Sequence, residues 1–202
     1  MGSNKQAFNL IFTGVGGQGN VLASQLIGQA FVKEGFYVTI GETYGASQRG
    51  GPVMSHIRIC KQKQRSPLIL RGGGDIVVAM EPIEALRVLA VYGNPKITVL
   101  FNPHPIHPTD VMAGDETYPE LQDIIEHLHK LSHAVYCVDA KEKALQLGSV
   151  ILGNMIMIGA LLELKILPLS VPKFFETLRD NMAGERLDAN LKAVEAGSKA
   201  IE

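Results

Sequence analysis

Short apolar segments alternate with longer amphipathic ones along most of the chain. Residues 8–13 form an apolar run that ends in a glycine-rich turn, and residues 20–34 follow with apolar side chains at helical spacing. Gly35 then ends this helix, as a left-handed C-terminal glycine does. We expect residues 67–70 to pair with 53–60 across a polar turn. The complete set of strand-like runs after the first is 37–40, 53–60, 67–70, 75–79, 96–101 and 134–138.

Helices are predicted between most of these runs. Pro82 suits the first turn of a helix that continues over residues 83–92, residues 121–131 form another, and the chain is helical from about residue 141 onward. Short, continuously apolar strands separated by helices are typical of a mostly parallel sheet covered on both faces. The sequence therefore predicts an α/β fold of three layers, α/β/α, with a Rossmann-like, mostly parallel sheet and a helical C-terminal region, in a single domain over residues 1–202.

The most apolar stretch of the chain, residues 150–162, contains Asn154 and is too short to cross a bilayer, which needs about 20 apolar residues. A helix that is apolar on all sides is instead buried in a core or under a partner. We expect this face to need cover, so that the isolated chain forms homodimers. Residues 1–6 are polar and contain no secretory signal, which predicts a cytoplasmic protein without a membrane span.

Charge and cysteine content exclude several classes of function. The formal net charge is −1, whereas a nucleic-acid-binding protein needs a clustered excess of Lys and Arg. The short basic run Lys61, Lys63 and Arg65 is interpreted as a solvent-exposed hairpin. Cys60 and Cys137 lie far apart, each at the end of a strand-like run. We therefore expect two buried, reduced thiols, and no disulfide framework, iron–sulfur cluster or structural zinc built from this chain alone.

The first glycine-rich turn allows two interpretations. Gly14, Gly16 and Gly19 match G-x-G-x-x-G between a strand and a helix, and Glu42 stands near the end of the second strand, where a ribose-binding acid is expected. This pattern predicts NAD or FAD, because the glycines let the backbone approach a pyrophosphate at a helix N-terminus. The alternative is a tight turn packed against a neighbouring loop or subunit. These residues alone do not decide between the two.

A second glycine-rich loop, residues 41–52, favours the alternative. It carries Arg49 among small residues, which a dinucleotide-binding dehydrogenase does not need at this position. Both loops leave the carboxyl ends of strands that we expect to be adjacent, so they would form one surface of backbone amides and a guanidinium, suited to an anion or another protein. The residues expected to face a substrate or partner are Gly14, Gly16, Gly17, Gln18, Gly19, Tyr44, Gln48, Arg49, Gly50 and Gly51.

Together these motifs resemble the gamma-type domain of the pyruvate and 2-oxoacid:ferredoxin oxidoreductases. Within that family, Ser-Gln-Arg-Gly-Gly followed by Ser-His-Ile-Arg is most similar to the small (beta) subunit of indolepyruvate ferredoxin oxidoreductase. That subunit often carries His where Tyr44 stands, so members specific for pyruvate or 2-oxoglutarate stay as alternatives. The matching segments, which span nearly the whole chain, are residues 14–19, 42–45, 47–51, 55–59, 153–155, 159–160, 188–191 and Gly197.

The resemblance implies a non-catalytic subunit of an enzyme that oxidatively decarboxylates a 2-oxoacid, with indolepyruvate or another arylpyruvate as the expected substrate, to an acyl-CoA and reduces ferredoxin. It implies thiamine diphosphate, magnesium and [4Fe-4S] clusters in a larger partner subunit, with CoA as co-substrate. Here Gly73-Gly74-Asp75 leads into a strand without the glycine of a thiamine motif, and two isolated cysteines cannot hold a cluster. We therefore expect no cofactor and no catalytic residue in this chain, and no activity when it is alone. A free-standing NAD- or FAD-dependent oxidoreductase and a non-enzymatic assembly module are the alternatives.

His104 and His107 form an H-x-x-H pair in a proline-rich loop. Outside a helix this spacing fixes no ligand geometry, and no third ligand is evident. We predict no metal site there.

Overall fold

The structure, a computed structural model, describes residues 7–44, 51–106 and 117–201. The strands of its sheet are β1 Phe8–Val15, β2 Tyr37–Tyr44, β3 Pro52–Cys60, β4 Ile76–Ala79, β5 Thr98–Phe101 and β6 Ala134–Cys137. They lie in the order β2-β3-β1-β4-β5-β6. β1, β4, β5 and β6 pair in parallel, whereas β3 runs antiparallel to both β1 and β2. β3 is thus the one reversed strand, and the predicted mostly parallel sheet is confirmed.

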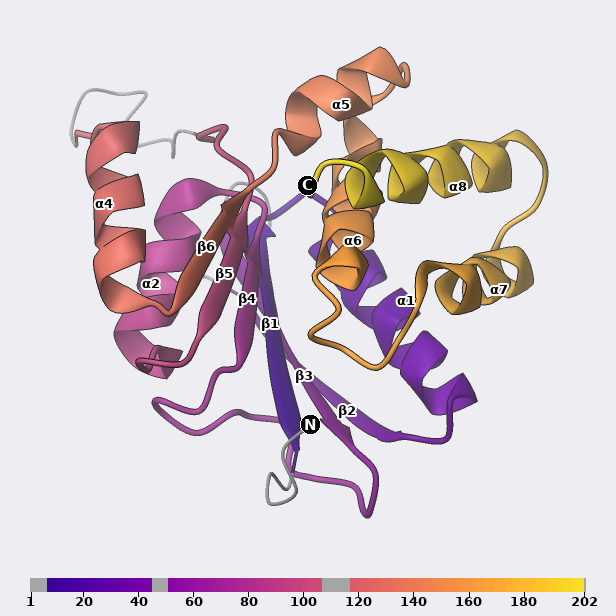
Figure 1. Cartoon of the computed structure of the whole chain (residues 1–202), viewed down its shortest axis with the longest axis horizontal. Helices are drawn as coiled ribbons and strands as arrows, with labels where there is room; N and C mark the ends of the chain where they lie inside the picture. The colour runs from indigo at the N-terminus through magenta and orange to yellow at the C-terminus, as the bar shows by residue number, and fades with distance from the viewer. Residues whose placement is uncertain (1–6, 45–50, 107–116, 202) are drawn as a thin grey trace.

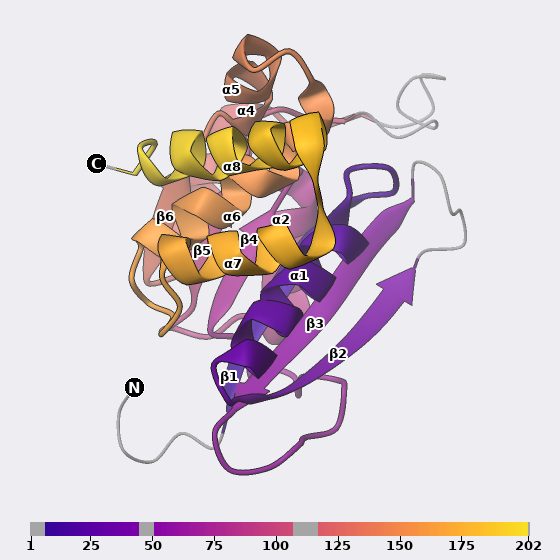
Figure 2. The same cartoon turned by 90° about the vertical axis from the view of Figure 1, so that its right-hand side faces the viewer.

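The helices cover both faces of the sheet, as predicted (Figure 1). They are α1 Asn20–Lys33, α2 Pro82–Tyr92, α4 Leu121–Leu131, α5 Ala140–Gln146, α6 Gly153–Glu163, α7 Val171–Asn181 and α8 Gly184–Ser198, with a 3₁₀ turn η1 at Val150–Leu152. α2 and α4 lie on one face, and α1, α6, α7 and α8 lie on the other. Figure 2 shows α1 lying along the long strands β2 and β3.

Alternation along the central strands divides the interior into two cores. Ile76 and Val78 of β4 belong to the core under α1 and α6, while Val77 and Ala79 belong to the core under α2 and α4. All four side chains are fully buried, because β4 lies inside the sheet and both of its faces are covered. This explains why the strand is continuously apolar.

α6 forms the centre of the helical layer, and its residues 153–162 are all buried. Its main neighbour is α8. Gly159 lies so close to the Val194 carbonyl oxygen that a Cβ would overlap it, and Gly197 stands in the same relation to the Ile156 carbonyl. The two backbones are therefore in direct contact, which any residue other than glycine at either position would prevent.

The prediction that residues 150–162 need cover from outside is wrong for the helix, because the chain covers α6 itself. Val150 and Ile151, just before it, are exposed by 56% and 77%. No helix among the described residues is long and apolar enough to cross a membrane.

The arrangement of the first three strands differs from the prediction. β2 continues to Tyr44, where a loop from residue 41 was expected, because residues 37–44 all pair with β3. β3 also lies between β1 and β2, so these two strands are not adjacent. The antiparallel pairing of β3 with β2 follows from the connection of residues 45–51, which is shorter than the dozen or so residues that a crossover to a parallel strand requires. β3 can therefore only pair with β2 as an antiparallel hairpin.

Residues 67–70 do not form the predicted strand. Pro67 has no amide hydrogen to donate to a sheet. A side chain holds the segment instead: Arg58 Nη1 donates hydrogen bonds to the carbonyls of Ser66 and Leu68, at 3.0 and 3.1 Å.

The two cysteines lie in different environments. Cys60 is buried and Cys137 is exposed, so the prediction of two buried thiols is wrong for Cys137. That residue ends β6, the edge strand of the sheet, whose last two residues are exposed.

Candidate functional site

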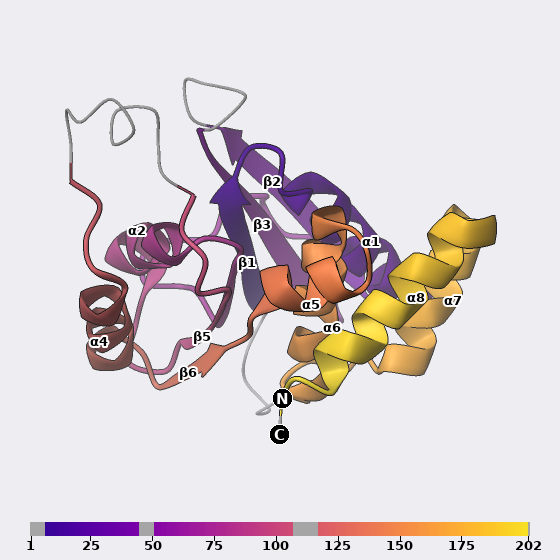
Figure 3. The same cartoon turned by 90° about the horizontal axis from the view of Figure 1, so that it is seen from above.

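A crevice of about 340 Å³ opens at the edge where the parallel strands end, the edge seen from above in Figure 3. Chain segments that follow β1, β4, β5 and β6 all contribute to it. β1 leads into a helix on one face of the sheet and β4 into a helix on the other, and a sheet binds ligands outside such a reversal point. The residues that line it are Gly17, Gln18, Met80, Asn102, His104, Pro105, Ile106, Ala140, Lys141, Val150, Ile151 and Gly153.

Two amide side chains hold the floor of the crevice together. Gln18 accepts a hydrogen bond from the Val15 amide at 2.6 Å and donates one to the Met80 carbonyl at 3.1 Å. Asn102 donates to the same carbonyl at 3.1 Å and accepts from the Ala140 amide at 3.1 Å. The ends of β1, β4, β5 and β6 are therefore fixed relative to one another before any partner or ligand arrives.

The first glycine turn needs glycine for close packing at Gly14 and for a left-handed backbone at Gly17 and Gly19. A Cβ on Gly14 would lie 2.9 Å from the Met80 Cβ and overlap the Gln18 side chain. Gly17 and Gly19 have φ of 106° and 77°, a left-handed backbone that favours glycine. The Asn154 amide of α6 covers Gly19 and donates to its carbonyl at 3.2 Å. Within this chain the turn therefore serves as a rigid support that packs against α6 and β4.

The two predicted loops meet at one point. The Gly16 amide donates to the Gly51 carbonyl at 2.9 Å, so the residue after β1 is tied to the residue before β3. Tyr44, 55% exposed, donates from its hydroxyl to Glu42 on the same strand, and that hydrogen bond raises the pKa of Tyr44. Residues 48–50 lie outside the described part of the chain, so the positions of Gln48, Arg49 and Gly50 stay predictions.

Glu42 does not stand where a ribose-binding acid would. It pairs with Ser55 of β3, and Ser55 in turn pairs with Phe12 of β1. Two strand spacings of about 4.8 Å each therefore separate Glu42 from the strand that carries the glycine turn. A dinucleotide-binding unit has these two strands side by side, so the described geometry does not match the NAD or FAD interpretation.

His104 and Lys141 lie at one side of the crevice. The His104 Nε2 lies 2.7 Å from the Asp139 Oδ1, and Asp139 also accepts from the Glu142 amide at 2.8 Å as the N-cap of α5. His107 lies outside the described residues, so the H-x-x-H pair is not tested. In the described part of the chain, no group of three or more His, Cys, Asp or Glu could hold a metal ion.

The rim of the crevice is apolar. Val150, Ile151 and Ile106 are exposed by 56%, 77% and 40%. Exposed apolar side chains grouped beside convergent polar groups are typical of surfaces that another protein covers.

Two buried carboxyl groups follow directly after Met80, at the start of α2. Glu81 is fully buried, and its carboxylate accepts hydrogen bonds from the Glu84 amide at 3.0 Å and from the Tyr118 hydroxyl. Burial raises the pKa of Glu81 in spite of these bonds. Burial also raises the pKa of Glu84 to about 7, against the opposing effect of Arg87, whose Nε lies 3.6 Å from the Glu84 Oε1. Both groups therefore hold protons at a higher pH than exposed glutamates do.

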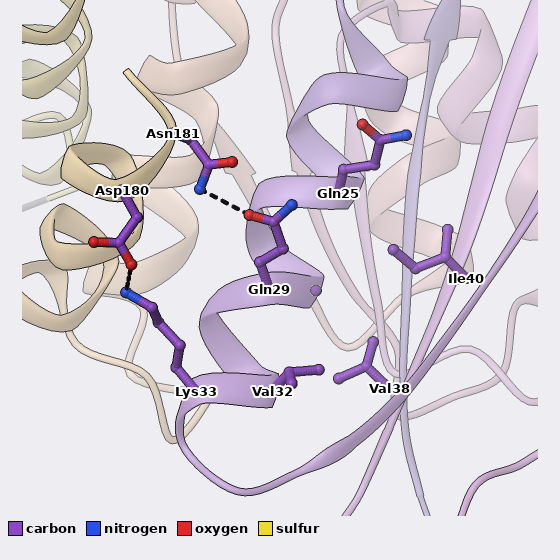
Figure 4. A pocket seen from close by; sticks show the side chains of 9 residues that line it. Gln25, Gln29, Val32, Lys33, Val38, Ile40, Asp180 and Asn181 are labelled. Atoms are coloured by element: carbon purple, nitrogen blue, oxygen red, sulfur yellow. Dashed lines mark hydrogen bonds and ion pairs between the residues drawn. The ribbon is translucent and has the colours of Figure 1, made fainter. Parts of the chain in front are cut away.

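A larger groove of about 500 Å³ lies between α1, β2 and the end of α7 (Figure 4). Four of its polar side chains pair with one another: Asn181 donates to Gln29 at 2.8 Å, and Lys33 forms an ion pair with Asp180. Val38 and Ile40 form its floor. The groove lies away from the strand ends and gathers no group suited to catalysis, so we place the functional site at the crevice.

Sequence reasoning missed several residues of the crevice, namely Met80, Asn102, Lys141 and Ile151. A signal for two of them was present. Asn102 follows directly after the buried strand β5, and Lys141 comes four residues after the end of β6. The carboxyl ends of parallel strands meet at one edge of the sheet. The prediction considered only the loops after the first two strands, so it identified only part of the residues that lie at this edge.

Comparison with known proteins assigns the chain to a family. A model of the pyruvate ferredoxin/flavodoxin oxidoreductase family matches residues 9–200, and the chain belongs to that family. It is 40% identical over 189 residues to indolepyruvate oxidoreductase subunit IorB of Archaeoglobus fulgidus, covering 94% of this chain and 92% of that protein. The IorB of Pyrococcus horikoshii is 35% identical over 196 residues, with 96% of each protein covered. The predicted resemblance is thereby confirmed.

Solved structures show the same fold. Pyruvate oxidoreductase subunit PORC of Thermotoga maritima superposes with a TM-score of 0.70 at 22% identity, and the match covers 98% of each chain. A 2-oxoglutarate:ferredoxin oxidoreductase of Magnetococcus marinus, solved with 2-oxoglutarate, coenzyme A and succinyl-CoA bound, gives a TM-score of 0.74 at 22% identity. This chain corresponds to 31% of that longer chain.

Proposed function

We propose that this chain is the small, cofactor-free subunit of a thiamine-dependent 2-oxoacid:ferredoxin oxidoreductase, and that its crevice receives the large catalytic subunit. The observation that carries the proposal is the crevice itself. It joins a preorganised polar floor to an exposed apolar rim at the edge where sheets of this type place their sites. The family assignment and the near full-length likeness to IorB subunits support the same conclusion.

The reaction proposed for the complex is oxidative decarboxylation of a 2-oxoacid to an acyl-CoA with reduction of ferredoxin. Thiamine diphosphate, magnesium and [4Fe-4S] clusters would belong to the large subunit, and CoA would be the co-substrate. The identities of 40% and 35% to indolepyruvate oxidoreductase subunits favour indolepyruvate or another arylpyruvate as the donor. Pyruvate and 2-oxoglutarate are the alternative donors, because a pyruvate/ketoisovalerate oxidoreductase gamma subunit is 25% identical and a 2-oxoglutarate:ferredoxin oxidoreductase shares the fold.

In this complex the chain forms a wall of the active site. The Gly17 backbone and Gln18 would present fixed polar groups to the partner, because Gln18 is already anchored to β1 and β4. Gln48, Arg49 and Gly50 are proposed to extend this surface from the neighbouring loop. None of them is proposed to be catalytic.

A charge placed on the apolar rim tests the proposal. Ile151→Asp should weaken association with the large subunit about tenfold or more, because it puts a carboxylate into an apolar contact. Association is measured by calorimetry, and activity by viologen reduction with indolepyruvate, pyruvate and 2-oxoglutarate as donors. When the large subunit is limiting, the weaker association of the Ile151 variant should also lower its activity. With the unmodified chain, indolepyruvate should give the highest kcat/KM of the three donors.

Val32→Asp is the matched control, since Val32 is 57% exposed but lies on the groove of Figure 4. It should associate like the unmodified chain. If the Val32 variant associated more weakly and the Ile151 variant associated like the unmodified chain, the interface would lie at that groove and the proposal would be overturned.

A further inference from the structure

A segment rich in basic side chains lies at the end of the molecule opposite the crevice. Residues 58–74 contain five basic side chains and no acidic one, in a chain of net charge −1. The five are Arg58, Lys61, Lys63, Arg65 and Arg71. The interpretation as a solvent-exposed hairpin holds for Lys61 and Lys63 but not for Arg65. That side chain is half-buried, and its Nε is buried with no hydrogen-bond acceptor in the described part of the chain.

Arg58 and Arg65 line the same recess, which measures about 420 Å³. The recess lies at the amino ends of β1, β4 and β5, so the six-residue path from Gly74 to Met80 separates it from the crevice by roughly 20 Å. Its lining consists of Ala7, Asn9, Arg58, Arg65, Gly72, Gly73, Gly74, Asn94 and Lys96. No carboxylate is among these residues.

Arg58 is held in place by neutral acceptors. Its Nε donates to the Asn9 Oδ1 at 3.1 Å, and its Nη1 donates to the carbonyls of Ser66 and Leu68 and to the Ser66 hydroxyl. The ion pairs found among the described residues do not include Arg58, Arg65 or Lys96. An arginine fixed by neutral groups keeps its charge and is preorganised for an anion.

The Arg65 guanidinium acts electrostatically on the neighbouring thiol of Cys60. Burial would raise the pKa of Cys60, but backbone hydrogen bonds and the Arg65 guanidinium lower it below the ordinary value. The guanidinium therefore favours negative charge beside it.

The acceptor groups on the wall of the recess are already engaged. Asn94 donates from its Nδ2 to the Gly72 and Gly74 carbonyls at 3.0 and 2.7 Å, and Asn9 donates to the Gly73 carbonyl at 2.7 Å. The nearby carboxylate of Asp75 accepts from the Asn9 amide at 2.8 Å and does not line the recess. The charge presented by the recess is therefore positive.

We propose that this recess binds the phosphate or diphosphate group of a small molecule. Two guanidinium groups and an ammonium on one concave surface match an oxyanion with more than one charge, since arginine binds phosphate with two parallel hydrogen bonds. The volume is in the range of small-ligand pockets. The source of the group is either free inorganic phosphate or a phosphorylated metabolite.

Calorimetric titration of the full chain at constant ionic strength tests the proposal, with inorganic phosphate, inorganic diphosphate and ADP as probes. Arg65→Gln should weaken diphosphate binding about tenfold, and Lys96→Ala should weaken it about threefold, since each removes one charge-assisted contact. Arg71→Gln is the matched control, because Arg71 is exposed in the same segment and does not line the recess. It should bind like the unmodified chain. Arg58 is not used, because its replacement would release residues 66–68.

The outcomes separate the alternatives. Diphosphate binding equal to that of ADP indicates a free anion, whereas tighter ADP binding indicates a phosphorylated metabolite. If the Arg65 and Arg71 variants weakened diphosphate binding equally, binding would depend on the overall positive charge of the segment and not on the recess, and the proposal would be overturned. Absence of binding to the unmodified chain at about 10 mM of each probe, a concentration that would detect even a weak site, would overturn it as well. The large subunit is not needed, so the result is independent of the proposed function.

Discussion

Gly159→Ala is expected to lower the free energy of unfolding by about 3 kcal/mol, at the upper end of what overpacking of a core costs. The new Cβ would overlap the Val194 carbonyl oxygen and lie 2.8 Å from the carbon of that group and 2.9 Å from the Ser198 amide nitrogen. These are backbone atoms of α8, so no side chain can rotate away. The helices must separate, and α6 loses contacts on a face that is buried throughout. Denaturant unfolding followed by circular dichroism gives the value.

Gly153→Ala provides the control on the same helix. Its Cβ would have the Met80 Cε as nearest neighbour at 3.5 Å, an ordinary contact. Because alanine favours helix more than glycine does, this variant should be unchanged or more stable by about 0.5 kcal/mol. Gly197→Ala probes the same contact from α8 and should cost about as much as Gly159→Ala. Equal stability of the Gly159 and Gly153 variants would refute direct backbone contact between α6 and α8.

Glu84→Gln is expected to stabilise the protein at alkaline pH and to reduce the pH dependence of its stability. Burial raises the pKa of Glu84 from the ordinary 4.5 to about 7, so between these values the folded state holds a proton that the unfolded state has lost. Stability then falls as the pH rises through this window, by about 3 kcal/mol in total for this group. A glutamine is neutral at every pH and does not incur this loss. The gain should be near zero at pH 4 and largest at pH 8.

Unfolding measured at intervals between pH 4 and pH 8 shows whether the two curves diverge. Glu185→Gln is the control, since Glu185 is exposed at the start of α8, and its curve should follow that of the unmodified protein. Parallel curves for the Glu84 variant and the unmodified protein would mean that the pKa of Glu84 is the same in the folded and unfolded states.

Much of the fold could be predicted from local pattern. The helix at 82–92 was recognised because Pro82 suits a first turn, and the structure adds Glu81 as its N-cap. The helix at 121–131 has the predicted bounds, and the strands of the parallel half fall within a residue or two of theirs. These elements are set by side-chain spacing within one segment, which a sequence displays directly.

Strand order is where the prediction failed, and only part of it could have been deduced from the sequence. The connection of residues 45–51 is too short for a parallel crossover, so an antiparallel pair could have been deduced from its length alone. What length does not fix is that β3 then inserts between β2 and β1. That depends on which apolar face of the hairpin packs under α1, a contact between distant segments that local pattern does not encode.

The candidate site shows the same division. Gly14 and Gly19 belong to the predicted G-x-G-x-x-G spacing, and their neighbours explain them: Met80 after β4 and Asn154 of α6. Gly17, predicted to face a substrate or partner, has a left-handed backbone. Asn102 and Lys141 could have been found by following every parallel strand to its end. The exposure of Ile151 could not, because it lies in the same apolar run as buried α6, and only the packing of η1 separates them.

The reversed strand between β1 and β2 has a consequence for how genomes are interpreted. Pattern searches score the three glycines, their spacing and an acid further along, but they contain no information on which strand becomes the neighbour of which. In this protein the sequence fingerprint is complete, but β3 lies between the strand that leads into the glycines and the strand that carries the acid. A search that also required a connection of about a dozen residues after the second strand, long enough for a crossover, would separate proteins of this kind from enzymes that bind a dinucleotide.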